Sequence, residues 1–464
     1  MKRMRYFFAA IGVLALGAGL IACGSNSTGS GSNANPNPQT ANGPIAIYGQ
    51  DAPLASVITF QLTLMSVTAS DGVNTTTLLS EPQTIDFARL TGLRTLLDLN
   101  SAPTGSYTSV TLMLASPVIG YINTSTNPPS VTMLDGTLTT SSVTVLMNPP
   151  LTITSSDLNG LRLDFDMRQS LQLDLNGQIT GTVVPTFDLL QVNPANAEAE
   201  IDDLRGGVVT VNAANQSFVM QIANGKQITV QESPSTVTDS GDSLANFTSN
   251  TIVEVSGLLN RTTMNLDADE VCVLTQDHFI ADGLITNVSA PTASDTDINL
   301  FVREALPANP AFMPDTIDPF DLPSNANYLI YRLNLPITQL LFNSGNLIVG
   351  QNITLGGPVN NSSLTVKRVV LHRQGAWGSW IPGTTMVQNG NAGSFQINEQ
   401  GVLGVLLNNA ALTVLTSNNT EFDGLSGLSA LTGSQGIPLN IVGLLLQDPA
   451  TGGPVLVAYR VSTP

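Results

Sequence analysis

The stretch ITFQLTL, residues 58–64, alternates apolar and polar side chains without a break. Successive side chains of a β-strand point to opposite faces, so a period of two places every apolar residue from Ile58 to Leu64 on one face. Thr59, Gln61 and Thr63 then lie on the other face. A strand with one apolar and one polar face is typical of a half-buried antiparallel sheet. The stretch therefore predicts a β-sheet protein.

The same alternation recurs between Ile45 and Val192, for example from Val110 to Leu114 and from Leu161 to Met167. Turn-forming sequences such as SDG at residues 70–72 separate these runs, and only residues 90–97 look helical. Two packed sheets are the usual way to bury such faces. We therefore expect an all-β chain whose residues 44–195 form a β-sandwich domain.

Composition limits what kind of protein this is. The chain has 464 residues, of which 42% are hydrophobic but only 11% are charged, so we expect several packed domains with largely neutral polar surfaces. It carries 16 basic and 34 acidic residues, which gives a net charge of −18. Nucleic-acid binding needs a concentration of basic residues. Its absence excludes nucleic acid as a partner.

The N-terminus has the layout of an export signal. Lys2, Arg3 and Arg5 precede an uncharged, largely apolar run from Tyr6 to Ala22, and Cys23 follows at once. A membrane-spanning helix needs about 20 apolar residues, and this run is shorter. The pattern therefore favours a signal that is removed over one that is retained as an anchor.

The residues Leu20-Ile21-Ala22-Cys23 resemble the lipobox of bacterial lipoproteins. The resemblance implies that residues 1–22 are a signal peptide and that Cys23 is the lipid-attachment site, with acyl chains such as palmitate as the membrane anchor. It also implies an exported protein of the cell envelope, and Gly24 in place of Asp favours the outer membrane. The alternative is an ordinary secretory signal, after which Cys23 has no special role.

The residues after Cys23 look like a tether. Residues 24–43 contain no charged residue and almost no apolar one, so they cannot bury enough surface to fold. We therefore predict that residues 23–43 comprise the lipidated cysteine and a disordered linker. Removal of residues 1–22 takes away three basic residues and no acidic one, which changes the net charge from −18 to −21. Membrane attachment should thus come from acyl chains and not from a basic patch.

The predicted sandwich resembles an uncharacterised domain family of bacterial lipoproteins. The matching features are a D-A-P opening at 51–53, a "vDl"-like element at 84–87 and a hairpin with the sequence APTGSY at 102–107. The closing LDFD at 163–166, Ser170 and Pro185 also fit. The resemblance implies a sandwich of transthyretin-like or immunoglobulin-like type and no known catalytic residue.

Beyond residue 195 the chain repeats itself loosely. Each unit has an early glycine, such as Gly206 or Gly283, followed by several strands, and then a closing apolar strand such as residues 369–371. The pattern resembles a second uncharacterised family of OB-like or other closed barrels that occur in tandem. We therefore predict three small β-barrel-like modules at residues 196–280, 281–380 and 381–464.

Residues suited to catalysis are scarce. The chain has two histidines, His278 and His372, and its only cysteine besides Cys23 is Cys272. A nucleophilic serine or cysteine needs a nearby base, and the sequence contains neither a G-x-S-x-G nor an H-E-x-x-H motif. We interpret His278 as a residue before a strand and His372 as part of an exposed strand face. Cys272, within an apolar run, is interpreted as a small core residue without a disulfide partner.

The other candidate sites can also be explained by ordinary structural roles. Acidic clusters at 267–270, 295–297 and 315–321 could bind Ca²⁺. The strand spacing of Asp267 and Asp269 instead predicts a solvated outer face, as alternation does for Asp164 and Asp166. Trp377 and Trp380 could stack on sugars from an exposed loop, whereas the simpler interpretation places them at a domain boundary. We therefore predict no catalytic residue, no cofactor and no metal site.

These observations favour a lipid-anchored, non-catalytic display or binding module of the cell envelope. Its partners would be the membrane, through the lipid, and an envelope glycan or protein. One alternative is a purely structural spacer. Another is a glycan hydrolase or lyase that uses carboxylates, because acidic residues are abundant.

Overall fold

Strands account for most of the described chain. The computed structural model describes residues 41–463 apart from residues 55, 80, 127, 197–198, 239–241, 331–340, 361–362, 409–410 and 433–435. About 60% of the chain is strand and 7% is helix, so the all-β prediction is confirmed. The predicted signal peptide, Cys23 and almost all of the predicted linker lie outside the described residues. None of the described helices is long and apolar enough to cross a bilayer.

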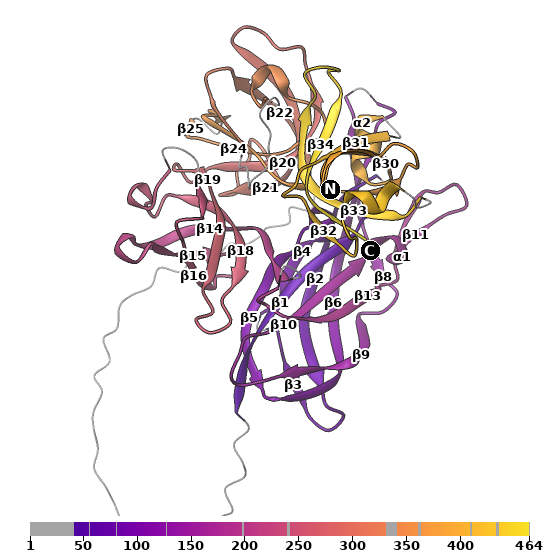
Figure 1. The fold of residues 1–464 in the computed structure, drawn as a ribbon, viewed down its shortest axis with the longest axis vertical. Coiled ribbons are helices and arrows are strands. Elements are labelled where there is room, and N and C mark those ends of the chain that lie inside the picture. Colours follow the sequence, from indigo (N-terminus) through magenta and orange to yellow (C-terminus); the bar gives the residue numbers. More distant parts are fainter. Residues whose placement is uncertain are drawn as a thin grey trace, which may run out of the picture. The chain divides into compact units, whose positions relative to one another are not determined.

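The N-terminal part is a sandwich of two main sheets (Figure 1). The first sheet has the order β13-β10-β1-β5, and consists of β1 (Asn42–Ala52), β5 (Thr95–Pro103), β10 (Asn159–Asp166) and β13 (Phe187–Val192). The second has the order β3-β2-β6-β7, with β4 paired to β2 and β9 paired to β6. Its strands are β2 (Val57–Ser70), β3 (Thr75–Thr77), β4 (Gln83–Asp86), β6 (Gly105–Asn123), β7 (Ser130–Asp135) and β9 (Ser142–Ile153).

Smaller elements complete the sandwich. The strands β8 (Thr137–Leu138), β11 (Leu171–Leu173) and β12 (Ile179–Val183) form a small sheet, and η1 (Phe87–Leu90) and α1 (Met167–Ser170) are single turns of helix. The helix expected at residues 90–97 is wrong: the helical turn ends at Leu90, and Thr95 begins strand β5. Residues 95–103 pair with β1 instead, because a strand can satisfy its backbone groups on the sheet.

The alternating residues meet inside the sandwich as predicted. Phe60 from β2 stacks on Phe165 from β10 with ring centroids 4.9 Å apart, and Ile45 and Ile47 of β1 belong to the same buried cluster. The other face of β1 is buried as well, because Ala46 and Tyr48 pack with apolar residues that lie beyond residue 195. Strand β1 therefore contributes to two hydrophobic cores, one on each of its faces.

The first module after the sandwich is a closed ring of five strands. They are β14 (Ile201–Asn212), β15 (Ser217–Ile222), β16 (Gln227–Gln231), β18 (Ile252–Leu259) and β19 (Leu266–Thr275). The pairing runs β16-β15-β14-β18-β19, and a parallel pairing of β16 with β19 closes the ring. Short elements lie outside it: η3 (Ala213–Asn215), β17 (Val237–Thr238) and η4 (Leu244–Asn246).

The second module repeats this order. Its strands are β20 (Ile280–Val288), β21 (Asp295–Leu306), β22 (Thr316–Pro323), β23 (Asn327–Ile330), β24 (Asn352–Gly356) and β27 (Arg368–Leu371). The pairing runs β22-β21-β20-β24-β27-β23, and β23 lies parallel to β27. Because β23 follows β22 in the chain, the two together correspond to β16 of the first module. The helical turn η5 (Ser344–Asn346) and the hairpin β25 (Val359–Asn360) with β26 (Ser363–Leu364) are additions.

The third module has the order of the first. Its ring is β28-β33-β34-β31-β30, closed by the pairing of β28 with β30, and β31 lies parallel to β34. The ring strands are β28 (Gln374–Trp380), β30 (Ala392–Glu399), β31 (Ala411–Thr416), β33 (Pro438–Gln447) and β34 (Pro454–Ser462). Further elements are β29 (Met386–Asn389), α2 (Val402–Leu407), β32 (Glu421–Asp423) and η6 (Leu428–Thr432).

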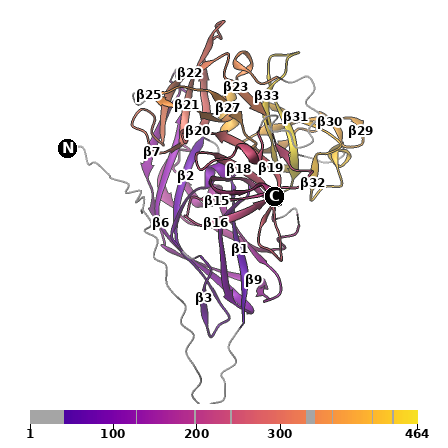
Figure 2. The same ribbon diagram turned by 90° about the vertical axis from the view of Figure 1, so that its left-hand side faces the viewer.

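One strand lies in a different module from the one predicted. The predicted division between residues 380 and 381 falls at the end of β28, which pairs with β33 and β30 of the third ring. The last strand of the second module ends at Leu371, so the link between the second and third modules is His372 and Arg373. In the turned view, β19 of the first module lies beside β27, which leads into this link (Figure 2).

Candidate functional site

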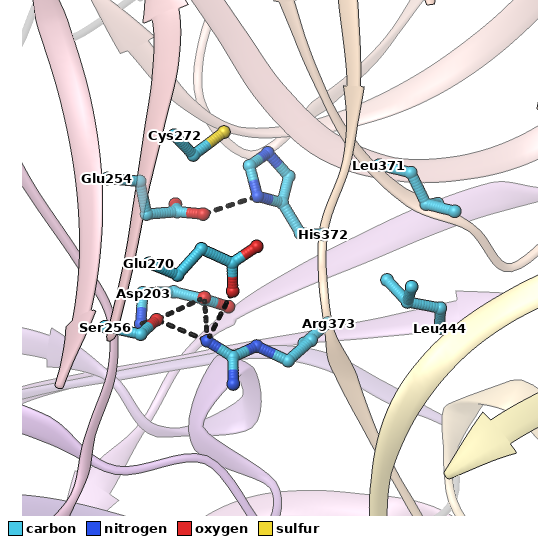
Figure 3. A pocket seen from close by; sticks show the side chains of 9 residues that line it. All are labelled: Asp203, Glu254, Ser256, Glu270, Cys272, Leu371, His372, Arg373 and Leu444. Carbon is cyan, nitrogen blue, oxygen red and sulfur yellow. Dashed lines mark hydrogen bonds and ion pairs between the residues drawn. The ribbon is translucent and has the colours of Figure 1, made fainter. Parts of the chain in front are cut away.

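The most concentrated group of charged side chains lies around this link. A cavity of about 20 Å³ opens there, which is space for about one water molecule. It is drawn in Figure 3, and its lining residues come from β14, β18 and β19 of the first module, from β27 of the second, from the link itself and from β33 of the third. They are Asp203, Glu254, Ser256, Glu270, Cys272, Leu371, His372, Arg373 and Leu444.

His372 is buried and fully engaged. Its Nδ1 lies 2.5 Å from Oε1 of Glu254, and its Nε2 lies 2.7 Å from Oγ1 of Thr354. The prediction that His372 sits on an exposed strand face is wrong, since only 3% of the residue is exposed. The basic neighbour Arg373 suggested solvent, but carboxylates of the first module cover this position and supply the partners that water would otherwise supply.

Thr354, His372 and Glu254 have the order hydroxyl, imidazole, carboxylate that activates a nucleophile in many enzymes. The Thr354 hydroxyl, however, donates its single proton to Asp282, with an Oγ1–Oδ2 distance of 2.9 Å. Its oxygen therefore accepts from His372, which is the reverse of the bond that activation needs. Thr354 is also fully buried. The three residues thus form a structural network.

Arg205 of β14 is the centre of one half of the site. Its guanidinium contacts Glu254 at 2.9 Å, Asp282 of β20 at 2.9 Å and Glu304 of β21 at 2.8 Å. Arg89 of the sandwich lies 3.7 Å from the same three carboxylates. Burial alone would raise the pKa of Glu254, but His372 and the two arginines lower it to about 2. The pKa of Asp282 is likewise held far below its usual range, because Arg205 and Arg89 outweigh its burial.

Arg373 is the centre of the other half. Three carboxylates surround it: Asp202 at 3.7 Å, Asp203 at 3.4 Å and Glu270 at 3.4 Å. It also donates to the Ser256 hydroxyl. Burial raises the pKa of Glu270 to about 7 and that of Asp203 to about 6, since Arg373 compensates only part of the cost of desolvating them.

Arg460 of β34 ties the third module to the rest. It contacts Glu200 and Asp202, each at 3.1 Å, and donates to the Gly92 carbonyl oxygen of the sandwich at 2.9 Å. Asp202 in turn accepts from the backbone N–H of Arg94 at 3.0 Å. The ion-pair network therefore includes residues of the sandwich and of all three modules, and we call it the charged junction.

The other residues singled out in the sequence lie elsewhere. Cys272 is a buried residue of β19, as predicted. His278 is an exposed turn residue just before β20 and bonds to Asn250. Trp377 and Trp380 are buried in β28, so they are not available to sugars on an exposed loop. The Arg168 guanidinium of the sandwich lies 3.9 Å above the ring of Trp377, which places this tryptophan at a domain boundary.

The acidic clusters are dispersed among separate faces. Asp267 and Asp269 are exposed as predicted, whereas Glu270 points to the opposite face and into the cavity. Asp164 is only partly water-facing, and burial raises its pKa to about 6. Within the described ranges, no three His, Cys, Asp or Glu side chains are arranged to hold a metal ion.

Sequence reasoning missed most of the charged junction. Glu254 lies in the apolar run IVEVSG and Asp282 in IADGLI. A single acidic residue within an otherwise apolar strand was the available signal, because such a residue is rarely buried without a partner. The partners themselves are far away in sequence and could not be named from it.

Comparison with known proteins covers the first domain. Residues 42–180 match the family described as "Domain of unknown function (DUF4382)". The match spans strand β1 through most of the sandwich, so the resemblance of the sandwich to an uncharacterised family is confirmed at that level. No curated protein matches the sequence.

Proposed function

We propose that this protein is a non-catalytic display or binding module that a lipid on Cys23 holds at the bacterial cell envelope. The lipobox resemblance of residues 20–23 supports the envelope part of the proposal, and the observation that carries the non-catalytic part is the charged junction. The main concentration of charged side chains in the described chain is used in contacts between the sandwich and the three modules. Such side chains hold domains together and are not presented to a substrate.

The size of the cavity also supports a non-catalytic role. About 20 Å³ accommodates one water molecule and not a sugar ring. A carboxylate-dependent glycan hydrolase needs two acids on either side of a substrate cleft, about 5–9.5 Å apart. Glu270 and Glu254 instead line a small cavity together with Arg373 and His372 (Figure 3).

The outer face of the second sandwich sheet offers a surface for display. The pairings of β3, β2, β6 and β9 place Thr77, Thr68, Thr111 and Thr144 in one row. All four are exposed or half-buried, and the next row contains Thr75, Ser70, Ser109 and Leu146. These two rows carry hydroxyl and apolar groups and no charge, which suits an uncharged glycan or a protein surface better than an ionic ligand.

The lipid anchor can be tested with the two cysteines of the full chain. In bacteria that express it, the Cys23→Ala variant should lose incorporation of labelled palmitate and should move from the membrane fraction to the soluble fraction. The matched control is Cys272→Ala, which alters the only other cysteine and should retain both label and membrane association. Palmitate on the Cys23→Ala protein would contradict the proposed anchor.

The absence of catalysis is tested on the same cells. The anchored protein should retain added envelope polysaccharide or a crosslinked envelope protein without releasing shortened glycan products. Product release that depends on a carboxylate of the chain would overturn the non-catalytic assignment and favour the hydrolase or lyase.

A further inference from the structure

The charged junction contains more acid than base around Arg373. Asp202, Asp203 and Glu270 all lie within 3.7 Å of its guanidinium. Asp202 has a second cation in Arg460 at 3.1 Å. Asp203 and Glu270 have Arg373 as the one cation in ion-pair contact among the residues that the structure describes. Asp203 and Glu270 thus share the Arg373 guanidinium, which Asp202 contacts as well.

Glu270 is the more isolated of the two. The residue is 5% exposed, and its Oε1 has no hydrogen-bond partner, whereas Oε2 contacts Arg373. Figure 3 shows one oxygen of this carboxyl group directed away from Arg373, toward the side of the cavity where His372 lies. An unpaired, ionised carboxylate oxygen in such a place is costly, so the site favours the protonated acid.

The other groups around Glu270 do not relieve this cost. Strands β14 and β18 present Asp202, Asp203 and Glu254, which are acidic, and β19 itself presents the Cys272 thiol. The link presents His372 and Arg373, but His372 is bonded to Glu254. From the third module, Tyr459 lies under Arg373 with 4.9 Å to its ring centroid, and Arg460 is paired with Glu200 and Asp202.

A proton fits this excess of negative charge better than a metal ion does. No three His, Cys, Asp or Glu side chains in the described parts of the chain have metal-binding geometry, and the cavity has room for about one water molecule. A single proton on a carboxyl group needs no coordination sphere. Protonation also converts the unpaired carboxylate oxygen into a hydroxyl, which could donate a hydrogen bond to a water molecule in the cavity.

We propose that the cavity beside Arg373 is a proton-binding site formed by Glu270 and Asp203, and that loss of its proton loosens the packing of the first module against the link between the second and third. The site couples the contact between the modules to the pH of the surrounding solution. It requires neither the lipid anchor nor any ligand.

The direction of the effect follows from the raised pKa values. Burial raises the pKa of Glu270 from 4.5 to about 7 and that of Asp203 from 3.8 to about 6. At a pH between the unfolded and the folded pKa of each acid, the folded chain therefore binds more protons than the unfolded chain. Its free energy of unfolding falls as the pH rises through this window, up to the folded pKa values of about 6 and about 7. The protonated junction should be the tighter one.

The test compares thermal unfolding of the full chain at pH 5.5 and pH 8. The wild-type midpoint should be several degrees lower at pH 8, and Glu270→Gln, which imitates the protonated acid, should show a smaller difference, because the contribution of Glu270 is removed and that of the other buried acids remains. The matched control is Asp267→Asn, which removes one negative charge from the exposed face of the same strand and should retain the wild-type difference. An unchanged pH dependence in Glu270→Gln would overturn the proposal.

Two further measurements keep the test informative if Glu270→Gln folds poorly. Both proteins are titrated in the native state from pH 8 to pH 5.5. The wild type should take up about one proton more than Asp203→Asn does. Hydrogen exchange, corrected for its intrinsic pH dependence, should increase in β19 and at the link on going to pH 8. Equal proton uptake, or exchange that changes equally throughout the chain, would contradict the site.

Discussion

Asp51 illustrates how burial alone changes the chemistry of a side chain. It is the acid of the D-A-P opening, lies near the end of strand β1 and is 1% exposed. Burial raises its pKa well above the ordinary value of 3.8, and the nearby carboxylate of Asp164 raises it further. The folded chain therefore holds this carboxyl in its neutral form under conditions in which the unfolded chain would ionise it.

We expect Asp51→Asn to stabilise the protein, and increasingly so as the pH rises. Between the unfolded and the folded pKa of Asp51, the wild type must keep this acid protonated in order to fold. Each pH unit in that range lowers its free energy of unfolding by about 1.4 kcal/mol. The amide carries no such cost. Urea unfolding of both proteins at pH 5 and pH 7 measures the gain, and a gain that is equal at the two pH values would contradict the explanation.

Asp71→Asn is the control, because the fold lowers the pKa of Asp71 whereas it raises that of Asp51. Asp71 is exposed in a turn and accepts from the backbone N–H groups of Asn74 and Val73 at 2.6 and 2.7 Å. These bonds lower its pKa, so its contribution to stability is present above the unfolded pKa and is lost as the pH falls. The amide should weaken the turn slightly at neutral pH.

At the scale of elements, β28 shows how a strand can serve two neighbours. It pairs with β33 and β30 in the third ring. Its Trp377 contacts Arg168 of the sandwich, and its Trp380 is buried in the core of the third module. The backbone of Gly375 approaches the sandwich so closely that an added Cβ would lie 1.7 Å from the Thr91 carbonyl oxygen.

Gly375→Ala should therefore separate β28 from the sandwich. We expect a loss of about 1–3 kcal/mol or more in the free energy of unfolding, because a backbone atom cannot move aside as a side-chain end can. Urea unfolding measures the loss. Gly207→Ala in β14 is the matched control, since an added Cβ there meets no atom within 4 Å and should change stability little; equal losses in the two variants would refute the steric argument.

Local patterns predicted the strands well and their partners poorly. The alternation at 58–64 and 161–167 correctly indicated β2 and β10, because the period of two is a property of the strand itself. Residues 95–97 looked helical but pair with β1, and β28 was assigned to the wrong repeat. Both errors concern pairing, which depends on a strand that lies elsewhere in the chain.

At the scale of the whole molecule, the charged junction holds four parts together. Arg205 and Glu254 are 49 residues apart in the sequence, and Arg460 and Glu200 are 260 apart. Buried ion pairs of this kind do not guarantee stability, since desolvation offsets much of their attraction. Removing one partner is nevertheless costly, because the remaining charges stay buried.

Arg205→Met should destabilise the protein strongly. It leaves Glu254, Asp282 and Glu304 with Arg89, at 3.7 Å, as the one arginine in contact with them among the described residues, and we expect a loss of about 3–5 kcal/mol. Limited proteolysis should then cut between the first and second modules. The control Arg261→Met removes an arginine from an exposed pair with Asp157 and should cost less than about 1 kcal/mol; a similar loss in both would contradict a structural role for the junction.

The sequence by itself determined the class of the protein: its alternating strands and its loose internal repeat both arise from local order along the chain. The sequence also carries the lipobox resemblance on which the envelope proposal rests. Cys272 could be assigned to a buried position in the same way. Only the tertiary structure decided that His372 is buried and that Glu254, Asp282 and Glu270 belong to one junction. The reason is that an ion pair depends on distance in space, and the strands that carry these residues meet only when the sandwich and the three rings pack together.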